Sequence, residues 1–348
     1  MKKYTQLTYR KRIKLETLFS VGMSKFQIAS HMKISLKTVY NEWNMGKYRH
    51  TLSDLTTEER YSAELAQERH DKNVSARGPV PKLLKDKKLA KCIEQKVADE
   101  GLSPEAAVAV MLQTGQMKKF SETVCAKTVY NSIDKGFFCR LTNKNLPVKR
   151  NKKKKKNKIH RQKRNCLGKS IEERPESVET REEFGHVEMD SIIGQRGKQK
   201  STMLTIFERK TRKAIIRKLP DKSAKSVVET LDGLERQLGD KFYQMFKTIT
   251  VDNGSEFADW EGIERSCIYP GKKRTTLYYC HPYSSCERAT NENGNRMVRR
   301  RVPKGMNFEN MTNKEIQEVE DWVNNYPRRM FGFRSSKDLY KEEMKYLI

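Results

Sequence analysis

Apolar side chains recur every three or four residues in three short stretches between residues 8 and 47, with a break at Gly22. Ser24 and Ser35 each stand directly before one of these stretches, where a hydroxyl can cap the first turn of a helix. The spacing predicts three short helices, with only two or three residues between the second and the third. The apolar positions are Ile13, Leu15, Leu18, Phe19, Phe26, Ile28, Ala29, Met32, Val39, Tyr40 and Trp43.

The third stretch has the features of a DNA-recognition helix. A short turn sets two helices at a steep angle, which lets the second enter a major groove. We therefore predict a helix-turn-helix DNA-binding domain over residues 1–50, with the recognition helix at residues 36–47. Its candidate DNA contacts are Lys37, Thr38, Tyr40 and Asn41. A plain three-helix bundle has the same apolar pattern and is the alternative.

A second helical unit follows the break Gly78-Pro79-Val80-Pro81. The pattern predicts a long helix over residues 83–100, a helix that opens at residues 103–105, and a last helix over residues 126–135. The pentapeptide Lys-Thr-Val-Tyr-Asn occupies residues 37–41 and again residues 127–131. This repeat predicts a second helix-turn-helix domain over residues 78–147, although chance similarity of short helices is the alternative. Its candidate DNA contacts are Lys127, Thr128, Tyr130 and Asn131.

Beyond residue 180 the chain changes to strand-like alternation. We predict a domain over residues 181–348 with a mixed five-stranded sheet and covering helices, an α/β fold, after the two all-α domains. The predicted strands are residues 186–193, 202–209, 214–219, 248–251 and 277–280, and the predicted helices are residues 223–238, 290–301 and 312–324.

The charge of the chain points to a polyanionic partner. Lys and Arg total 72 against 44 Asp and Glu, a formal charge of +28. Such an excess favours double-stranded DNA, with solubility alone as the alternative. Residues 148–180 are predicted to be a basic linker, because residues 148–169 contain twelve Lys or Arg and no acid. A linker of this kind follows phosphates without reading sequence.

The sequence does not indicate a membrane protein, a disulfide framework or a structural zinc site. The chain has no apolar run long enough for a membrane span and begins with a polar stretch, so we expect a cytoplasmic protein without a membrane partner. Its seven cysteines are scattered and lack a Cys-x-x-Cys pair, which argues against a disulfide framework. Cys267, Cys280, His281 and Cys286 suggest zinc only weakly, since their spacing lacks the regular pairs of a structural site.

Three acids stand where metal-binding carboxylates are needed. Asp190 lies inside a predicted strand, Asp252 ends another, and Glu292 lies in a predicted helix. A carboxylate at a buried strand is costly unless it is paired or binds a cation, and Mg²⁺ prefers oxygen ligands. Asp252-Asn253-Gly254 alone is only a turn signal, and a hairpin is its commoner meaning.

Together these motifs resemble a known family. Residues 184–190 (Phe-Gly-His-Val-Glu-Met-Asp), residues 251–254 (Val-Asp-Asn-Gly) and the segment from Pro282-Tyr283-Ser284 to Thr290-Asn291-Glu292-Asn293 are similar in order and spacing to integrase-core DDE transposases. More narrowly, the chain resembles the IS30 family of bacterial insertion-sequence transposases. The likeness also includes residues 170–175, 208–212 and 303–305, and covers most of the chain up to about residue 340.

The resemblance implies a ribonuclease-H-like catalytic domain that cuts and joins DNA at the terminal inverted repeats of an insertion sequence, in a nucleoid-associated protein. It implies that Asp190, Asp252 and Glu292 are catalytic and hold Mg²⁺ or Mn²⁺, two ions per site, which activate the attacking oxygen and stabilise the leaving one. Asn291, Asn293 and Asn295 are candidates for orienting Glu292. Arg288 matches a basic family position, and Arg296, Arg299 and Arg300, with Arg301, are further candidates for gripping phosphates.

Some features depart from the family pattern. Cys286 stands where an aromatic residue is usual, and Ala289 where a glycine is usual. Thirty-nine residues separate Asp252 from Glu292, more than is customary, with residues 269–276 as the extra loop. A DNA-binding repressor without catalysis and a nuclease that cuts without joining are the competing functions. Action at two DNA ends implies a homodimer or larger oligomer, although no heptad pattern indicates its interface.

Overall fold

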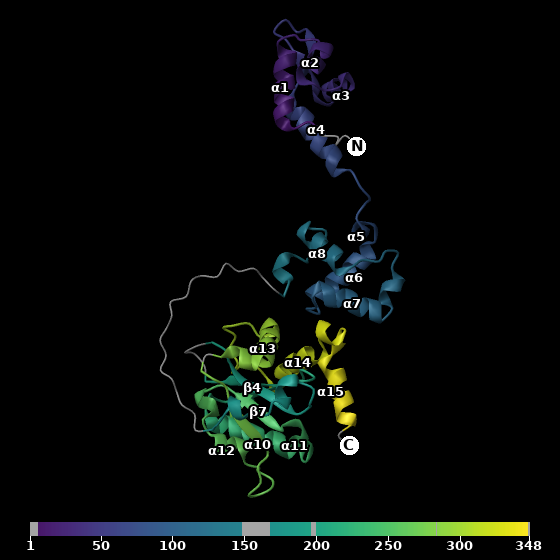
Figure 1. The fold of residues 1–348 in the computed structure, drawn as a ribbon. Helices are drawn as coiled ribbons and strands as arrows, with labels where there is room; N and C mark the ends of the chain where they lie inside the picture. The colour runs from purple at the N-terminus through teal and green to yellow at the C-terminus, as the bar shows by residue number, and fades with distance from the viewer. Residues whose placement is uncertain (1–5, 148–167, 196–199, 283, 347–348) are drawn as a thin grey trace. The chain divides into compact units, whose positions relative to one another are not determined.

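The computed structural model describes residues 6–147, 168–195, 200–282 and 284–346. The chain forms two compact units, Met1–Pro81 and Lys82–Ile348, whose elements are drawn in Figure 1. Residues 148–167 of the predicted linker, including Cys166, lie outside the described residues. The predicted domain boundaries remain predictions. In the described part of the chain, none of the helices combines the length and the apolar character that a membrane span requires.

The first unit contains three helices at the predicted positions: α1 (Tyr9–Ser20), α2 (Lys25–Met32) and α3 (Leu36–Gly46). The Ser35 hydroxyl accepts the backbone N–H of Thr38 at 3.1 Å and so caps α3. A buried ion pair between Arg12 and Glu42, with Nε and Oε2 2.9 Å apart, ties α1 to α3. These contacts surround a small apolar core that includes Leu15, Ile28 and Val39.

The prediction of an all-α domain over residues 1–50 is contradicted at residues 47–50, which belong to a strand. A hairpin of β1 (Lys47–Thr51) and β2 (Thr57–Tyr61) follows α3 and leads into α4 (Ala63–Ser75). Most hairpin side chains are polar and at least partly exposed, so the sequence lacks the alternation that marks a strand. What holds the hairpin is Tyr61, which is 5% exposed and packs on Gly46, where any Cβ would overlap its ring.

The second unit begins with helices. Residues 83–100 were predicted to form one helix, but Asp86 divides them by capping α6 through the backbone N–H of Leu89 at 2.9 Å. Ser103 caps α7, whose first residue is Pro104, as the sequence predicts. The helices are α5 (Lys82–Lys85), α6 (Lys87–Ala98), α7 (Pro104–Gln113) and α8 (Ala126–Asp134).

The repeated pentapeptide lies at the start of α3 and of α8 in the same orientation. Val39 and Val129 are both fully buried, whereas Tyr40 and Tyr130 are both exposed. The lysine and the asparagine of each copy are exposed as well. The two helices therefore present the same polar face to solvent, which is the face predicted to contact DNA.

A mixed six-stranded sheet forms the centre of the second unit, in the order β3-β8-β7-β4-β5-β6. Strands β4, β5 and β6 are antiparallel neighbours, whereas β4, β7, β8 and β3 run parallel. The predicted mixed α/β sheet is confirmed, but the predicted count of five strands is wrong, because the sheet has a sixth strand, β3. This strand has only two residues, too few for a periodic signal. The strands are β3 (Lys169–Ser170), β4 (His186–Ile193), β5 (Thr202–Glu208), β6 (Ala214–Leu219), β7 (Thr248–Val251) and β8 (Thr276–Tyr279).

Both faces of the sheet are covered. Strand β5 is buried throughout and sends Leu204 and Ile206 into one core and Met203 and Phe207 into the other. Helix α10 (Ala224–Leu238) packs in the first core, and α13 (Ala289–Arg301) and α14 (Asn313–Asn325) pack in the second. The remaining elements are α9 (Ser177–Thr180), α11 (Lys241–Met245), α12 (Trp260–Glu264), β9 (Pro327–Arg328), β10 (Arg334–Ser335) and α15 (Ser336–Lys345).

Candidate active site

Two of the predicted acids lie side by side at one edge of the sheet. Asp190 is in β4, and Asp252 directly follows β7, the parallel neighbour of β4. The register pairs Glu188 with Thr250, so Asp190 and Asp252 each lie two residues beyond the same rung. Strand pairing, rather than proximity in sequence, thus brings these two carboxylates together.

A cationic side chain lies between these two carboxylates. Arg288, in the 3₁₀ turn Ser285–Arg288 before α13, places Nη2 2.9 Å from Oδ2 of Asp252 and Nη1 3.5 Å from Oδ1 of Asp190. Its Nη1 also donates to the carbonyl of Met189 at 3.2 Å. Burial raises the pKa of the Asp190 carboxyl even though Arg288 acts in the opposite direction. Asp190 and Asp252 therefore form a site that favours positive charge, and the guanidinium group of Arg288 supplies that charge.

The third acid lies in the first turn of α13. Glu292 is on the exposed side of α13, where its carboxylate forms an ion pair with Arg296 one turn later. Among the described residues, the only three acidic, His or Cys side chains with ligand atoms all within 4.8 Å of one another are Asp232, Glu235 and Cys267. The structure thus joins Asp190 and Asp252 through Arg288, whereas Glu292 pairs with Arg296. The ligand atoms of the three acids do not all lie within 4.8 Å of one another.

Helix α13 is held on the sheet by two asparagines one turn apart. The backbone N–H of Asn291 donates to the buried carboxylate of Glu188 at 2.8 Å, and the Asn291 amide donates to the Glu188 carbonyl at 2.9 Å. The Asn295 amide donates to Oδ2 of Asp190 at 2.9 Å and accepts from the Thr205 hydroxyl at 2.8 Å. Asn295 therefore orients Asp190, rather than Glu292 as the sequence suggested. Glu188, which anchors Asn291, is not among the predicted site residues, because its burial and its hydrogen bonds cannot be read from the sequence alone.

Gly294 permits the close approach of α13 to the sheet. A Cβ at this position would overlap the ring of Phe207, which is 1% exposed in β5. Gly294→Ala is therefore expected to push α13 outward, to cost about 1–3 kcal/mol of stability and to displace Glu292. Urea unfolding of the full chain measures this cost.

The matched control is Gly233→Ala in α10, where a Cβ meets nothing within 4 Å. This change is expected to leave stability unchanged or to raise it by about 0.5–1 kcal/mol. Equal stability of the Gly294→Ala protein and the wild type would show that α13 does not need this contact.

The predicted phosphate-gripping arginines make contacts within the second unit. Nη2 of Arg299 donates to the carbonyl of Ile193 at 2.6 Å. Arg300 donates to the carbonyl of Gly101 and stacks on Trp322, with its guanidinium carbon 5.0 Å from the ring centroid. Arg301 donates to the Glu100 carbonyl at 2.8 Å. Their contact with DNA remains a prediction.

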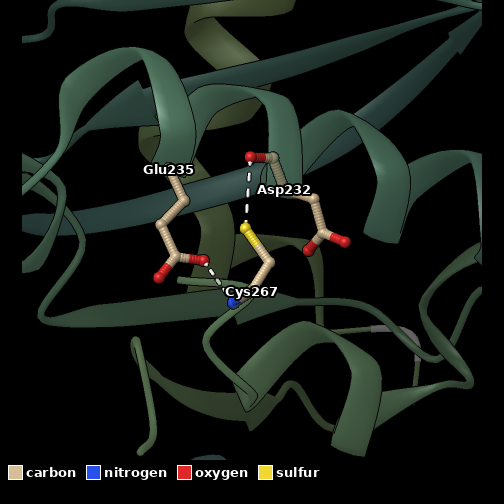
Figure 2. A group of neighbouring side chains, drawn as sticks. All are labelled: Asp232, Glu235 and Cys267. Atoms are coloured by element: carbon tan, nitrogen blue, oxygen red, sulfur yellow. Dashed lines mark hydrogen bonds between the residues drawn. The ribbon is translucent and has the colours of Figure 1, made fainter. Parts of the chain in front are cut away.

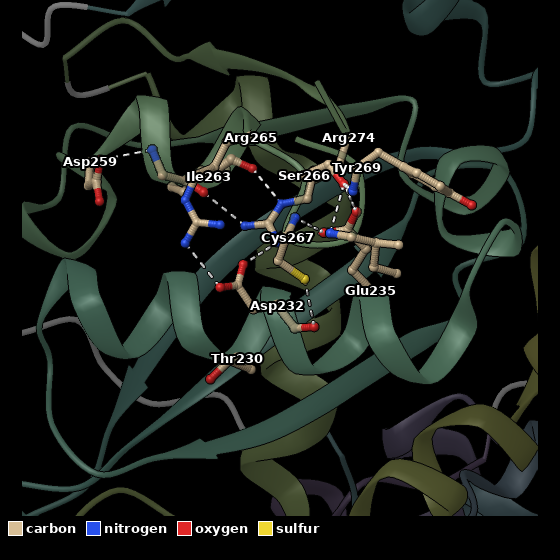
Figure 3. Close-up of polar contacts among 12 residues, drawn as sticks. Thr230, Asp232, Glu235, Asp259, Ile263, Arg265, Ser266, Cys267, Tyr269 and Arg274 are labelled. Carbon is tan, nitrogen blue, oxygen red and sulfur yellow. Dashed lines mark hydrogen bonds and ion pairs between the residues drawn. The ribbon is translucent and has the colours of Figure 1, made fainter. Parts of the chain in front are cut away.

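Buried charges hold the segment between Asp252 and Glu292 that is longer than the family pattern. Figure 2 shows Asp232, Glu235 and Cys267, and Figure 3 shows these residues with Arg265 and Arg274. Nη1 of Arg274 lies 2.6 Å from Oδ1 of Asp232 and 3.1 Å from Oε2 of Glu235, both on α10. The backbone N–H of Cys267 donates to the same Oε2 of Glu235 at 2.9 Å. Burial opposes ionisation of Glu235, but hydrogen bonds from Cys267, Ser266 and Tyr243 lower its pKa to about 2.

This acidic group is an ion-pair network rather than a metal centre. Asp232, Glu235 and Cys267 lie close enough to hold an ion, but Arg274 already neutralises the two carboxylates, and Arg265 also pairs with Asp232 at 3.0 Å. Burial raises the pKa of the Cys267 thiol, which disfavours the thiolate that zinc requires. In the described part of the chain, the four residues that weakly suggested zinc form no common site.

Several known transposases are similar in sequence to this chain. No protein-family model matches the chain. It is 40% identical over 172 residues to the transposase for insertion sequence element IS4351 of Bacteroides fragilis, covering 49% of each chain. It is 37% identical over 215 residues to the "Probable transposase for insertion-like sequence element IS1161" of Streptococcus salivarius, covering 62% of this chain and 58% of the relative.

The chain is similar to insertion-sequence transposases. Transposase InsI for element IS30A of Escherichia coli is 31% identical over 176 residues, covering 49% of this chain and 42% of that protein, in agreement with the resemblance drawn from the motifs. The chain spans about half the length of the curated relatives it matches. Among solved structures, the catalytic core domain of BIV integrase covers 47% of this chain and 98% of that chain, with 18% identity and a TM-score of 0.34.

Proposed function

We propose that this chain is a DNA transposase that cuts DNA at the ends of an insertion sequence and joins them to a target. The observation that carries the proposal is the convergence of Asp190 and Asp252 on a single cationic group at one edge of a mixed sheet. The similarity to curated transposases supports it. A ribonuclease-H-like catalytic domain is part of this proposal, since a mixed sheet covered by helices fits that fold.

The residues fit a divalent metal. The site offers carboxylate oxygens, which Mg²⁺ and Mn²⁺ prefer, and Arg288 stands between Asp190 and Asp252 in the way a cation would. Asp190 and Asp252 would hold the metal, two ions in the proposed site, with Glu292 completing it. Such ions stabilise the charge that develops at a phosphate during displacement. Asn295 would fix the orientation of the Asp190 carboxylate.

DNA recognition is proposed for the two helical repeats. Helices α3 and α8 present the same lysine, tyrosine and asparagine to solvent from the repeated pentapeptide. These side chains supply phosphate contacts and base-edge hydrogen bonds when such a helix enters a major groove. Two DNA ends require two active sites, so the proposed working form is a homodimer or a larger oligomer on DNA.

Strand transfer by the purified full chain tests the proposal. With Mg²⁺ and labelled DNA that contains the inverted repeats of its own element, we expect both cleaved and joined products, and neither product when EDTA replaces Mg²⁺. Cleavage without joining would indicate a nuclease. Tight binding without cleavage would indicate a DNA-binding repressor.

Glu292→Gln is expected to abolish both products while binding of the same DNA stays within about twofold. The Glu292 side chain is 47% exposed, so its exchange should not disturb the core. Glu318→Gln, on the exposed side of α14, is the matched control and should behave as wild type. Normal strand transfer by the Glu292→Gln protein would remove Glu292 from the catalytic set.

A further inference from the structure

A second cationic site lies beside α13, and neither of the two aspartates lines it. A cavity of about 210 Å³ is lined by Arg181, Arg212 and Arg328 together with Phe207, Thr290 and Gly294. We refer to it as the arginine pocket. Its arginines come from three distant segments: the end of α9, the turn between β5 and β6, and β9.

The arginine pocket concentrates positive charge, and its hydrogen-bond partners are hydroxyl and carbonyl groups. Within the described residues, Arg212 donates to the Thr290 hydroxyl, and Arg328 donates to the Ser336 hydroxyl at 2.8 Å and to the Val323 carbonyl at 3.4 Å. None of the described Asp or Glu residues forms an ion pair with Arg181, Arg212 or Arg328. Arg212 is only 9% exposed, and its hydrogen-bond partner is a hydroxyl rather than a carboxylate, so its charge is held there at a cost.

The positive charges of the arginine pocket oppose one another. Burial and the charge of Arg212 together lower the pKa of Arg328 to about 10, although Tyr326 acts in the opposite direction. Burial and the charge of Arg181 likewise lower the pKa of Arg212, although Glu188 and Glu208 act in the opposite direction. A bound anion would relieve this repulsion.

The backbone around the pocket favours the same ligand. Thr290 belongs to the first turn of α13, a helix of 13 residues, so the positive end of the helix dipole adds to the guanidinium charges. Arg181 and Arg212 both have φ of 60°, a left-handed conformation that is costly for a residue with a side chain. Residues in this conformation occur at ligand-binding sites as well as at helix ends and tight turns.

We infer that the arginine pocket binds a phosphate group. Guanidinium forks match the geometry of phosphate oxygens, and the cavity is large enough for more than a water molecule. The source of the phosphate is either a DNA backbone phosphodiester or free inorganic phosphate. The DNA source rests on the proposed function, and it would anchor a strand against α13, the helix that also carries Glu292.

The test uses the full chain, EDTA and a non-specific 30-base-pair duplex, so that no catalysis is needed. Each lost phosphate contact lowers the slope of log K against log salt by about one. We expect this loss in Arg181→Gln, whose side chain is exposed, and in Arg328→Gln. Arg236→Gln, on the exposed side of α10, is the matched control and should keep the wild-type slope.

A second arm uses inorganic phosphate alone. Sodium phosphate, compared with sodium chloride at equal ionic strength, should raise the thermal midpoint of the wild type but not that of Arg181→Gln. A reduced slope together with lost protection supports a phosphate site used by DNA. Lost protection with an unchanged slope supports a site for free phosphate and overturns the DNA source. No protection of the wild type together with unchanged slopes in both variants overturns the inference, whether or not the chain transfers strands.

Discussion

Asp190→Asn is expected to lower strand transfer by about a thousandfold or more. Divalent ions contribute several kcal/mol to the stabilisation of a reacting phosphate, and each 1.36 kcal/mol corresponds to about tenfold in rate. Asparagine keeps the shape of Asp190 and can still accept the hydrogen bond from the backbone N–H of Ser191, which is 2.9 Å away. Because burial raises the pKa of the Asp190 carboxyl, a neutral side chain should be tolerated at this position.

A binding readout separates loss of metal from loss of fold. Mn²⁺ should raise the thermal midpoint of the wild type in proportion to ln(1 + [Mn²⁺]/Kd), and should leave that of Asp190→Asn unchanged. Glu318→Gln should respond to Mn²⁺ as the wild type does. Undiminished strand transfer by Asp190→Asn, or an Mn²⁺ response equal to that of the wild type, would exclude Asp190 as a metal ligand.

Much of the sheet could be predicted because its strands are periodic. Strand β5 alternates between two cores, so Leu204 and Phe207 contribute to opposite faces, and its predicted range differs from the observed one by a single residue. The hairpin of β1 and β2 could not be predicted, because its polar side chains show no alternation. Its stability depends instead on the packing of Tyr61 against Gly46, a long-range contact.

The candidate site was predictable in part for the same reason. The sequence places Asp190 in one strand and Asp252 directly after another, and the register sets each two residues beyond the same rung. The position of Arg288 between them depends on how a turn folds back, which spacing does not specify. The convergence of Arg181, Arg212 and Arg328 from three segments likewise follows only from the tertiary fold.

Arg274→Met is expected to cost about 3–5 kcal/mol of stability, the range for removing one partner of a buried ion pair. Arg274 is fully buried, and besides its two carboxylates it donates to the carbonyls of Ile263 and Gly262 at 2.8 and 2.9 Å. Methionine fills a similar volume but leaves Glu235, whose side chain is also fully buried, without its cation. Urea unfolding of the full chain, followed by tryptophan fluorescence and circular dichroism, measures the loss.

Arg265→Gln is the matched control for this network. Arg265 pairs with the same Asp232, but its side chain is 51% exposed, so its loss should cost less than about 1 kcal/mol. Because Arg274 already neutralises the carboxylates, Zn²⁺ should not raise the unfolding midpoint of the wild type through Cys267. Stabilisation by Zn²⁺ that disappears in Cys267→Ser would mean that Asp232, Glu235 and Cys267 bind metal. It would also mean that the metal displaces Arg274 from the two carboxylates.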